Sequence, residues 1–351
     1  MKSRRKIHRR KRRCLSMGVN ALVPHNLEDS KPMSDSENCH EIDVYILSLE
    51  TTVLRIRFPS RSMNIHISDF LCLREGALLN DIIIDFYINH IAAHLLPDDS
   101  VLKLHLFPAL FWCHMKESQA KTLALCSKSD LNGGSNIDGK DKSLSENDRI
   151  CQLEYWLDEE NIFDADFLIL PINHKQHWSL VVVCSPFLSL SCNLPDQNGQ
   201  DLPLKPVVII FDSQQPVEVS LKSLIITELD RFFELAFTKQ SSNYSGYCFK
   251  NGSFKCIMPK NLPQQKNNVD CGVYILEYAR RFLLSPPSIE CLQSGDFDFS
   301  LLYPDFDVSG KRCEIQRTVL SLCSDYDIWR NLLNTVDVPF KYENHVVRIE
   351  R

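Results

Sequence analysis

The pattern of apolar and polar positions along this chain predicts helices first, then strands, then helices again. The clearest early segment is LLNDIIIDFYINHIAAHLL, where Ile83, Tyr87 and Ile91 recur at helical spacing. Asp81 falls in the first turn of this helix, where the helix dipole favours an acid. Two apolar runs before it, VYILSL and TVLRIRF, are typical of strands.

Three near-continuous apolar runs in the middle of the chain predict strands at 166–171, 177–184 and 207–211. Runs of this kind suit a sheet that is covered on both faces. A polar pentapeptide, 172–176, is expected to separate the first two strands.

Helical spacing returns after the strands. Helices are predicted at 218–237, from Cys271 onward in CGVYILEYARRFLL, in VSGKRCEIQRTVLSLCSDY and at 328–334. This order of helices, sheet and helices favours an α+β fold.

Composition shifts divide the chain into a tail, a domain and a short end. Residues 1–42 are polar and lack periodic apolar positions, which predicts disorder. One folded domain is expected at 43–340, followed by a C-terminal tail at 341–351. Polar, Gly-, Ser- and Asn-rich stretches predict mobile insertions in this domain, at 116–148, 185–206 and 238–263.

The bulk composition excludes several classes of protein. The 351 residues are 44% apolar and 24% charged, as in soluble globular proteins, and no run suits a membrane span or a secretory signal. The 14 cysteines include no C-x-x-C pair, so zinc-site spacing is absent and a reducing compartment is expected. Neither a metal nor an organic cofactor is expected.

The net charge of −6 conceals an asymmetry. Residues 1–13 carry nine Lys or Arg and no acid, while the rest of the chain carries 30 basic and 45 acidic residues. The folded domain is therefore not expected to bind nucleic acid. The basic run predicts nuclear import, with a nucleic-acid-contacting arm or a solvated tail as alternatives. The expected location is the nucleus, with the cytoplasm as the alternative.

Four residues are candidates for nucleophilic chemistry. Cys271 begins a predicted helix, whose N-terminus favours a thiolate. His177 opens one strand and Asp212 follows the next, so adjacent strands can bring base and acid to one edge. Gln265 lies six residues before Cys271 and can aim its amide at an oxyanion. Singly, each residue more often packs, caps or turns the chain.

The combination of sequence motifs decides between these interpretations. HWSLVVV, IIFDS and LPQQKNNVDCGVYILEY, in this order, resemble the ubiquitin-like-specific (SUMO- or sentrin-specific) cysteine protease family. The family pattern Q-x-N-x-x-D-C-G is filled here by Gln265, Asn267, Asp270, Cys271 and Gly272. The resemblance covers about residues 60–335.

The resemblance implies a papain-like cysteine protease fold of the ubiquitin-like protease type, with a central mixed sheet flanked by helices. It implies Cys271 as nucleophile, His177 as base, Asp212 as its orienter and Gln265 in the oxyanion hole. The implied reaction is hydrolysis of the peptide or isopeptide bond after the C-terminal Gly-Gly of SUMO. The implied partners of this chain, expected to be a monomer, are SUMO or another ubiquitin-like protein and its conjugates.

The resemblance also implies a substrate site. Trp178 matches an aromatic ring that roofs the Gly-Gly tunnel, with a buried core aromatic as the alternative. Leu78 stands where the family has a second aromatic, before a Leu-Asn-Asp motif that includes Asn80. Asp81 matches an acid that meets a basic residue of the partner, with a helix N-terminal charge as the alternative. Gly272 is expected to leave room for the substrate.

GALLNDIIIDFY, DADFLILPINHKQHWSLVVVC and VSGKRCEIQ are most similar to the subgroup that trims poly-SUMO chains. SUMO deconjugation and chain trimming both stay open. Three other functions are weighed against these: a protease for NEDD8 or ubiquitin, an effector-type acyltransferase, and a non-catalytic SUMO-binding module. The Q-x-N-x-x-D-C-G wording and Trp178 disfavour the acyltransferase, and the presence of Cys271, His177 and Asp212 disfavours the module.

Overall fold

The computed structural model describes residues 46–97, 100, 102–116, 161–192, 204–325, 341–343 and 346–348. All of them belong to one compact unit that spans Val44–Arg351. The expected N-terminal tail, nearly all of the expected insertion at 116–148 and the predicted helix at 328–334 lie outside the described residues.

A five-stranded mixed sheet forms the centre of the fold, in the order β10-β8-β6-β5-β4. Its strands are β4 (Leu104–Leu106), β5 (Phe167–His174), β6 (His177–Cys184), β8 (Val207–Asp212) and β10 (Lys255–Ile257). The pairs β5–β6 and β6–β8 are antiparallel, whereas β4–β5 and β10–β8 are parallel. The three strands expected from the apolar runs are confirmed.

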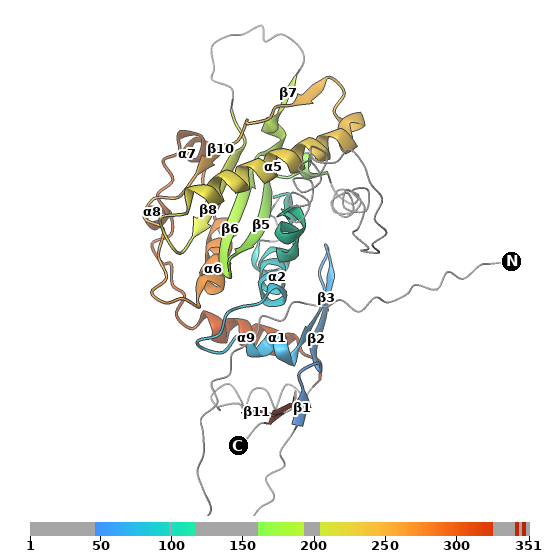
Figure 1. The fold of residues 1–351 in the computed structure, drawn as a ribbon, viewed down its shortest axis with the longest axis vertical. Coiled ribbons are helices and arrows are strands. Elements are labelled where there is room, and N and C mark those ends of the chain that lie inside the picture. The colour runs from blue at the N-terminus through green and yellow to red at the C-terminus, as the bar shows by residue number, and fades with distance from the viewer. Residues whose placement is uncertain are drawn as a thin grey trace, which may run out of the picture. The chain divides into compact units, whose positions relative to one another are not determined.

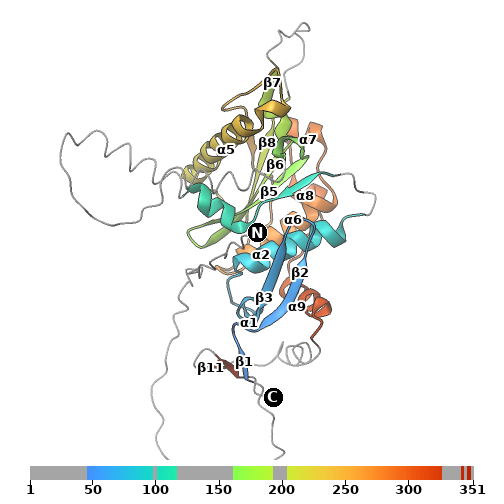
Figure 2. The same ribbon diagram turned by 90° about the vertical axis from the view of Figure 1, so that its right-hand side faces the viewer.

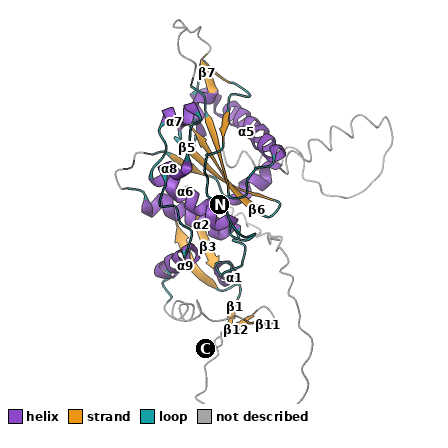
Figure 3. Cartoon of the chain, turned by 90° about the vertical axis from the view of Figure 1, so that its left-hand side faces the viewer, coloured by secondary structure: helices purple, strands orange, loops and turns teal. Residues whose placement is uncertain are grey.

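Side chains of the central strands alternate between two buried layers. On β6, Leu180 and Val182 join one apolar cluster, and Val181 and Val183 join the other. Helices α2 (Asp81–His90) and α6 (Cys271–Leu284) cover the first side. Helix α5 (Val219–Gln240) and the helical residues 109–116 cover the second (Figures 1 and 2). Burial on both faces confirms the prediction, and Figure 3 shows helices on both sides of the strands.

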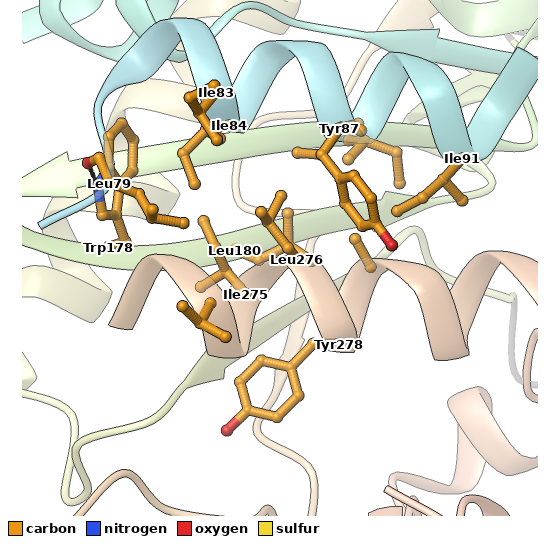
Figure 4. Close-up of a cluster of buried hydrophobic side chains, with 14 of the residues drawn as sticks. Leu79, Ile83, Ile84, Tyr87, Ile91, Trp178, Leu180, Ile275, Leu276 and Tyr278 are labelled. Atoms are coloured by element: carbon orange, nitrogen blue, oxygen red, sulfur yellow. Dashed lines mark hydrogen bonds between the residues drawn. The ribbon is translucent and has the colours of Figure 1, made fainter. Parts of the chain in front are cut away.

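Helices α2 and α6 pack against each other over β6. Ile83 and Tyr87 of α2, with Ile91 just after it, form the face that meets Leu276 of α6 and Leu180 of β6 (Figure 4). All five side chains are almost completely buried. The predicted early helix is therefore confirmed, although its last turn, η1 (Ile91–Leu95), is a π-helix.

The turn between β5 and β6 is shorter than the sequence predicts. β5 continues through Asn173 to His174, which pairs with His177, so only Lys175 and Gln176 form the turn. Both turn residues have positive φ, 52° and 64°. Two such residues suit the twist of a tight hairpin, but neither is the Gly, Asn or Asp that normally signals it.

Two of the expected insertions contain regular structure. Residues 185–206 include η3 (Pro186–Ser189) and β7 (Leu190–Cys192), and β7 pairs with β9 (Tyr247–Phe249). The stretch 238–263, expected to be irregular, contains the end of α5, η4 (Ser241–Asn243), β9 and the edge strand β10. The sequence missed β9 and β10 because three residues carry too little alternation to indicate a strand.

The structure describes ten further elements. They are β1 (Ile46–Ser48), β2 (Thr52–Arg57), β3 (Ser62–His66), α1 (Ile67–Leu71), η2 (Ile162–Asp164), α7 (Ile289–Ser294), α8 (Phe299–Leu302), α9 (Lys311–Leu322), β11 (Lys341–Glu343) and β12 (Val346–Arg348). β12 lies between β1 and β11, so the expected C-terminal tail carries two short strands. In the described part of the chain, no helix combines the length and apolar character that crossing a membrane requires.

Candidate active site

His177 and Asp212 meet where β6 begins and β8 ends. The antiparallel register pairs Ser179 with Asp212, so His177 lies two residues beyond the last paired row. The imidazole Nε2 is 2.7 Å from Asp212 Oδ1. Both residues come from strand ends, as the apolar runs predict, and their contact follows from the register alone.

The Asp212 carboxylate is buried, 2% exposed, and has three hydrogen-bond donors. Oδ1 accepts from His177 and from the backbone N–H of Gln214 at 2.8 Å. Oδ2 accepts from Ser179 Oγ at 2.7 Å. A buried carboxylate that is bonded on both oxygens cannot rotate freely, so it holds the imidazole in one orientation.

Cys271 is the first residue of α6 and is 1% exposed. Its backbone N–H is among the four that have no partner within the helix, and the dipole at this end favours an anion. The thiol lies close enough to His177 to raise the pKa of the imidazole. Because Nε2 is engaged by Asp212, Nδ1 is the ring nitrogen that remains available to the thiol.

Burial lowers the pKa of His177. Hydrogen bonding with Asp212 and Cys271 raises this pKa by more than burial lowers it, so the pKa moves from 6.5 to about 9. The imidazole is therefore protonated near neutral pH. An imidazolium beside a thiol at a helix N-terminus favours the thiolate. The arrangement can hold Cys271 and His177 as an ion pair.

Two adjacent glutamines tie the loop before α6 to the end of β8. Gln264 donates to the Asp212 carbonyl at 3.3 Å and accepts from the Gln215 backbone N–H at 2.8 Å. Gln265 donates its backbone N–H to the Ser213 carbonyl at 3.0 Å. The Gln264 carbonyl also accepts from the Tyr274 hydroxyl of α6 at 3.1 Å. The loop is thus bonded both to the sheet and to the helix that carries Cys271.

Leu79 connects the residues that follow His177 and Cys271. Trp178 is buried, and its Nε1 donates to the Leu79 carbonyl at 2.9 Å (Figure 4). A Cβ added to Gly272 would stand 2.9 Å from the Leu79 Cβ, too close for two carbons. The room beside Gly272, which the sequence suggested for substrate, is occupied by Leu79.

The other residues expected to bind substrate lie at the start of α2. Leu78 is 37% exposed beside the buried Leu79. Asn80 caps α2 by accepting from the Ile83 N–H at 3.0 Å, and its amide donates to Asp69 at 2.8 Å. Burial raises the pKa of Asp81, and backbone N–H groups act against this shift. Asn80 is thus engaged within the fold, while Leu78 is open to a partner.

Arg312 of α9 is a structural centre that the sequence did not reveal. It is 8% exposed, and its guanidinium donates to Asp270 from Nη2 at 2.7 Å and from Nε at 3.2 Å. It also donates to four backbone carbonyls, those of Cys72, Arg74, Ala77 and Val269. Arg312 therefore joins the loop before α2 to the residue preceding Cys271. The only sequence signal was its place in VSGKRCEIQ, because an Arg in a helix usually faces solvent.

Among the described residues, no group of three or more His, Cys, Asp or Glu side chains could hold a metal ion. The chemistry that this arrangement can perform by itself is nucleophilic attack by a thiolate, with a nearby acid–base imidazole.

The chain is similar in sequence and fold to known proteins. A profile of the Ulp1 protease family, C-terminal catalytic domain, matches residues 77–316, more than half of the chain. Ubiquitin-like protease 4 of Caenorhabditis elegans is 34% identical over 290 residues, covering 81% of this chain and 66% of the nematode protein. Sentrin-specific protease 7 of Homo sapiens is 25% identical over 263 residues, covering 62% of this chain and 23% of the human protein. The chain thus spans less than two thirds of either relative.

A solved structure described as the crystal structure of the de-sumoylating protease superposes with a TM-score of 0.51. It is 18% identical and the match covers 81% of this chain and 93% of that one. At this identity the likeness concerns the fold, and it confirms the expected α+β fold of the ubiquitin-like protease type.

Replacing His177 with Gln should change how stability depends on pH. The pKa of His177 is higher in the folded chain than its ordinary 6.5, so its protonated form stabilises the fold fully below about pH 6.5. This contribution is lost as the pH rises through about 9. The free energy of unfolding, measured with urea at pH values from 6.5 to about 9, should fall less with rising pH in His177→Gln than in the wild type. The exposed His94→Gln serves as control, and equal losses in all three chains would contradict the expectation.

Replacing Arg312 with Lys should destabilise the fold by roughly 2–4 kcal/mol, because an ammonium group cannot serve Asp270 and four carbonyls together. Arg317→Lys, an exposed change on the same helix, should stay within about 0.5 kcal/mol of the wild type. Urea midpoints at constant m-value provide the measurement. Equal midpoints for the two variants would show that the Arg312 contacts contribute little.

Proposed function

The chain belongs to the Ulp1 protease family, and we propose that it hydrolyses the bond after the C-terminal Gly-Gly of SUMO. The single observation that carries this proposal is the connected set Cys271–His177–Asp212 at the N-terminus of α6. The catalytic unit is proposed to span residues 43–340.

The proposed roles follow from the contacts. Cys271 is the nucleophile, His177 the base and later the acid, and Asp212 keeps Nε2 engaged so that Nδ1 faces the thiol. Gln265 and the Cys271 backbone N–H bind the oxyanion. Because Cys271 is 1% exposed, bulk water is largely kept from the thiolate until substrate arrives.

The reaction proceeds in two halves. The Cys271 thiolate attacks the terminal glycyl carbonyl, and the C=O electron pair moves to oxygen. Collapse of this oxyanion expels the amine, which takes its proton from His177, and leaves a thioester. Neutral His177 then removes a proton from water, which attacks the thioester. The Gly-Gly carboxylate leaves, and Cys271 and His177 regain their starting states.

Two observations support SUMO as the ubiquitin-like partner. The sequence wording around Cys271 resembles the SUMO-specific proteases, and sentrin-specific protease 7 is among the relatives. Trp178, Leu78 and Asp81 gather where α2 begins, and we assign this region to the partner's tail. Removal of SUMO from conjugates and trimming of SUMO chains use the same chemistry. The segment VSGKRCEIQ favours trimming, because it resembles the subgroup that trims poly-SUMO chains.

A test compares vinyl-sulfone forms of SUMO, NEDD8 and ubiquitin. A mass increase of one SUMO is expected with the wild type and with Cys313→Ser, which changes an exposed thiol, but not with Cys271→Ser. His177→Gln should slow hydrolysis of a SUMO C-terminal amide by roughly 10²–10⁴-fold, as expected for loss of a triad member.

Adducts with NEDD8 or ubiquitin alone would move the substrate to those proteins. Adducts with none would favour a non-catalytic binding module, and acylation of Cys271 by an acyl-coenzyme A would favour an acyltransferase. Faster cleavage of di-SUMO than of a SUMO precursor is expected for chain trimming, and the reverse order would contradict it.

We also propose that the protein acts in the nucleus. The support is the run KSRRKIHRRKRR, whose basic residues suit recognition by an import receptor. It lies outside the described residues.

Deleting residues 2–13 from a fluorescent fusion should lower the ratio of nuclear to cytoplasmic signal. A matched fusion with these Lys and Arg residues replaced by Gln should behave in the same way, because charge is what matters. An unchanged distribution in both would overturn the proposal.

A further inference from the structure

Ser213, the residue after Asp212, is buried at 1% exposure and contacts Gln265 twice. Its Oγ lies 2.5 Å from Gln265 Oε1, and its carbonyl accepts the Gln265 backbone N–H at 3.0 Å. The second contact fixes the backbone of the loop. The first fixes the side-chain amide, which is the group proposed to bind the oxyanion.

The neighbours of the Gln265 amide determine which way it faces. Gln265 Nε2 donates to the Asn267 carbonyl, which can only accept a hydrogen bond. The amide nitrogen must therefore lie on the Asn267 side and the amide oxygen on the Ser213 side. Ser213 consequently acts as the donor in its bond with Gln265.

Although both ends of the Gln265 side-chain amide are held by hydrogen bonds, one of its two N–H groups has no partner so far. An amide nitrogen carries two N–H groups, and Asn267 takes one of them. The other has no acceptor among the residues that the structure describes. Its direction is set by the amide plane, which the bonds to Ser213 and Asn267 define. A donor held in this way before reaction is what oxyanion stabilisation requires.

We propose that Ser213 is a positioning residue, whose hydroxyl orients Gln265 so that its remaining N–H points at the oxyanion. This inference rests on the proposed hydrolase function. Ser213 touches neither the substrate nor the reacting atoms and acts only through Gln265.

Ser179 offers a matched comparison within the same site. It is also a buried serine, 0% exposed, and its Oγ also donates to the side-chain oxygen of a site residue, Asp212, at 2.7 Å. Replacing either serine with Ala removes one buried hydroxyl and one hydrogen bond. Ser179 acts on the His177 side of the site, whereas Ser213 acts on the oxyanion side.

The experiment is a double-mutant cycle on the full chain, with Ser213→Ala, Gln265→Ala and the double variant. Hydrolysis of a fluorogenic SUMO C-terminal amide gives kcat and KM. Gln265→Ala should lower kcat about 100-fold, and Ser213→Ala about tenfold with KM unchanged. In the Gln265→Ala background, Ser213→Ala should change kcat by less than about twofold.

A second measurement separates positioning from general damage. The rate of Cys271 modification by SUMO vinyl sulfone needs the thiolate and tail binding, but that reagent has no carbonyl at the attacked atom. Ser213→Ala should leave this rate within about twofold of the wild type. Ser179→Ala should slow both reactions, and by the same factor with or without Gln265.

Equal effects of Ser213→Ala in both backgrounds, or a loss of vinyl-sulfone modification that matches the loss of hydrolysis, would overturn this inference and leave the hydrolase function intact. A wild type that neither hydrolyses the amide nor reacts with the probe would instead overturn the proposed function, and this inference with it.

Discussion

The antiparallel pairing of β6 with β8 is the constraint on which the site depends. Its register sets Ser179 opposite Asp212, so Ser179 hydrogen-bonds with Asp212, and it brings His177, two residues beyond this row, within hydrogen-bond distance of the same carboxylate. A slip of one residue would send the carboxylate to the other face of the sheet. The rows behind it, such as Val182 with Ile209, are fully buried on both strands. The hydrophobic burial that stabilises the sheet therefore also holds His177 beside Asp212.

A second constraint brings Cys271 to that strand end. Leu79 packs against Gly272, which follows Cys271, and its carbonyl binds Trp178, which follows His177. Leu79, which belongs to neither element, thus sets the distance between α6 and β6. Arg312 holds the loop leading to Leu79 and, through Asp270, the start of α6. Cys271 of the helix and His177 of the strand are thus aligned by contacts of the residues that follow them.

The sequence predicts the parts of this arrangement that depend on local hydrophobic pattern or on sequence motifs. Apolar runs predict β5, β6 and β8, and helical spacing predicts that Cys271 opens α6. The hairpin at Lys175 was missed because its residues are not those that normally adopt positive φ. The structural role of Arg312 was missed because most of its partners are backbone carbonyls. Every residue has a carbonyl, so the sequence does not indicate which ones Arg312 binds. Gly272 was noticed, but its neighbour Leu79 is 193 residues away in sequence, and only the folded chain identifies the contact.

The register also explains how the chain accommodates a long insertion between His177 and Asp212. His177 and Asp212 are 35 residues apart, yet the segment between β6 and β8 joins Cys184 to Val207, the paired row at the opposite end of these strands. β5 enters the sheet in that same end row, where Phe167 pairs with Cys184. β10 begins there too, with Lys255 beside Val207. The segment 185–206 leaves and re-enters the sheet at this end row, which lies about 17 Å, five strand residues, from the row of Asp212. Added length there leaves the register of β6 and β8 unchanged, so Asp212 stays opposite Ser179 and beside His177.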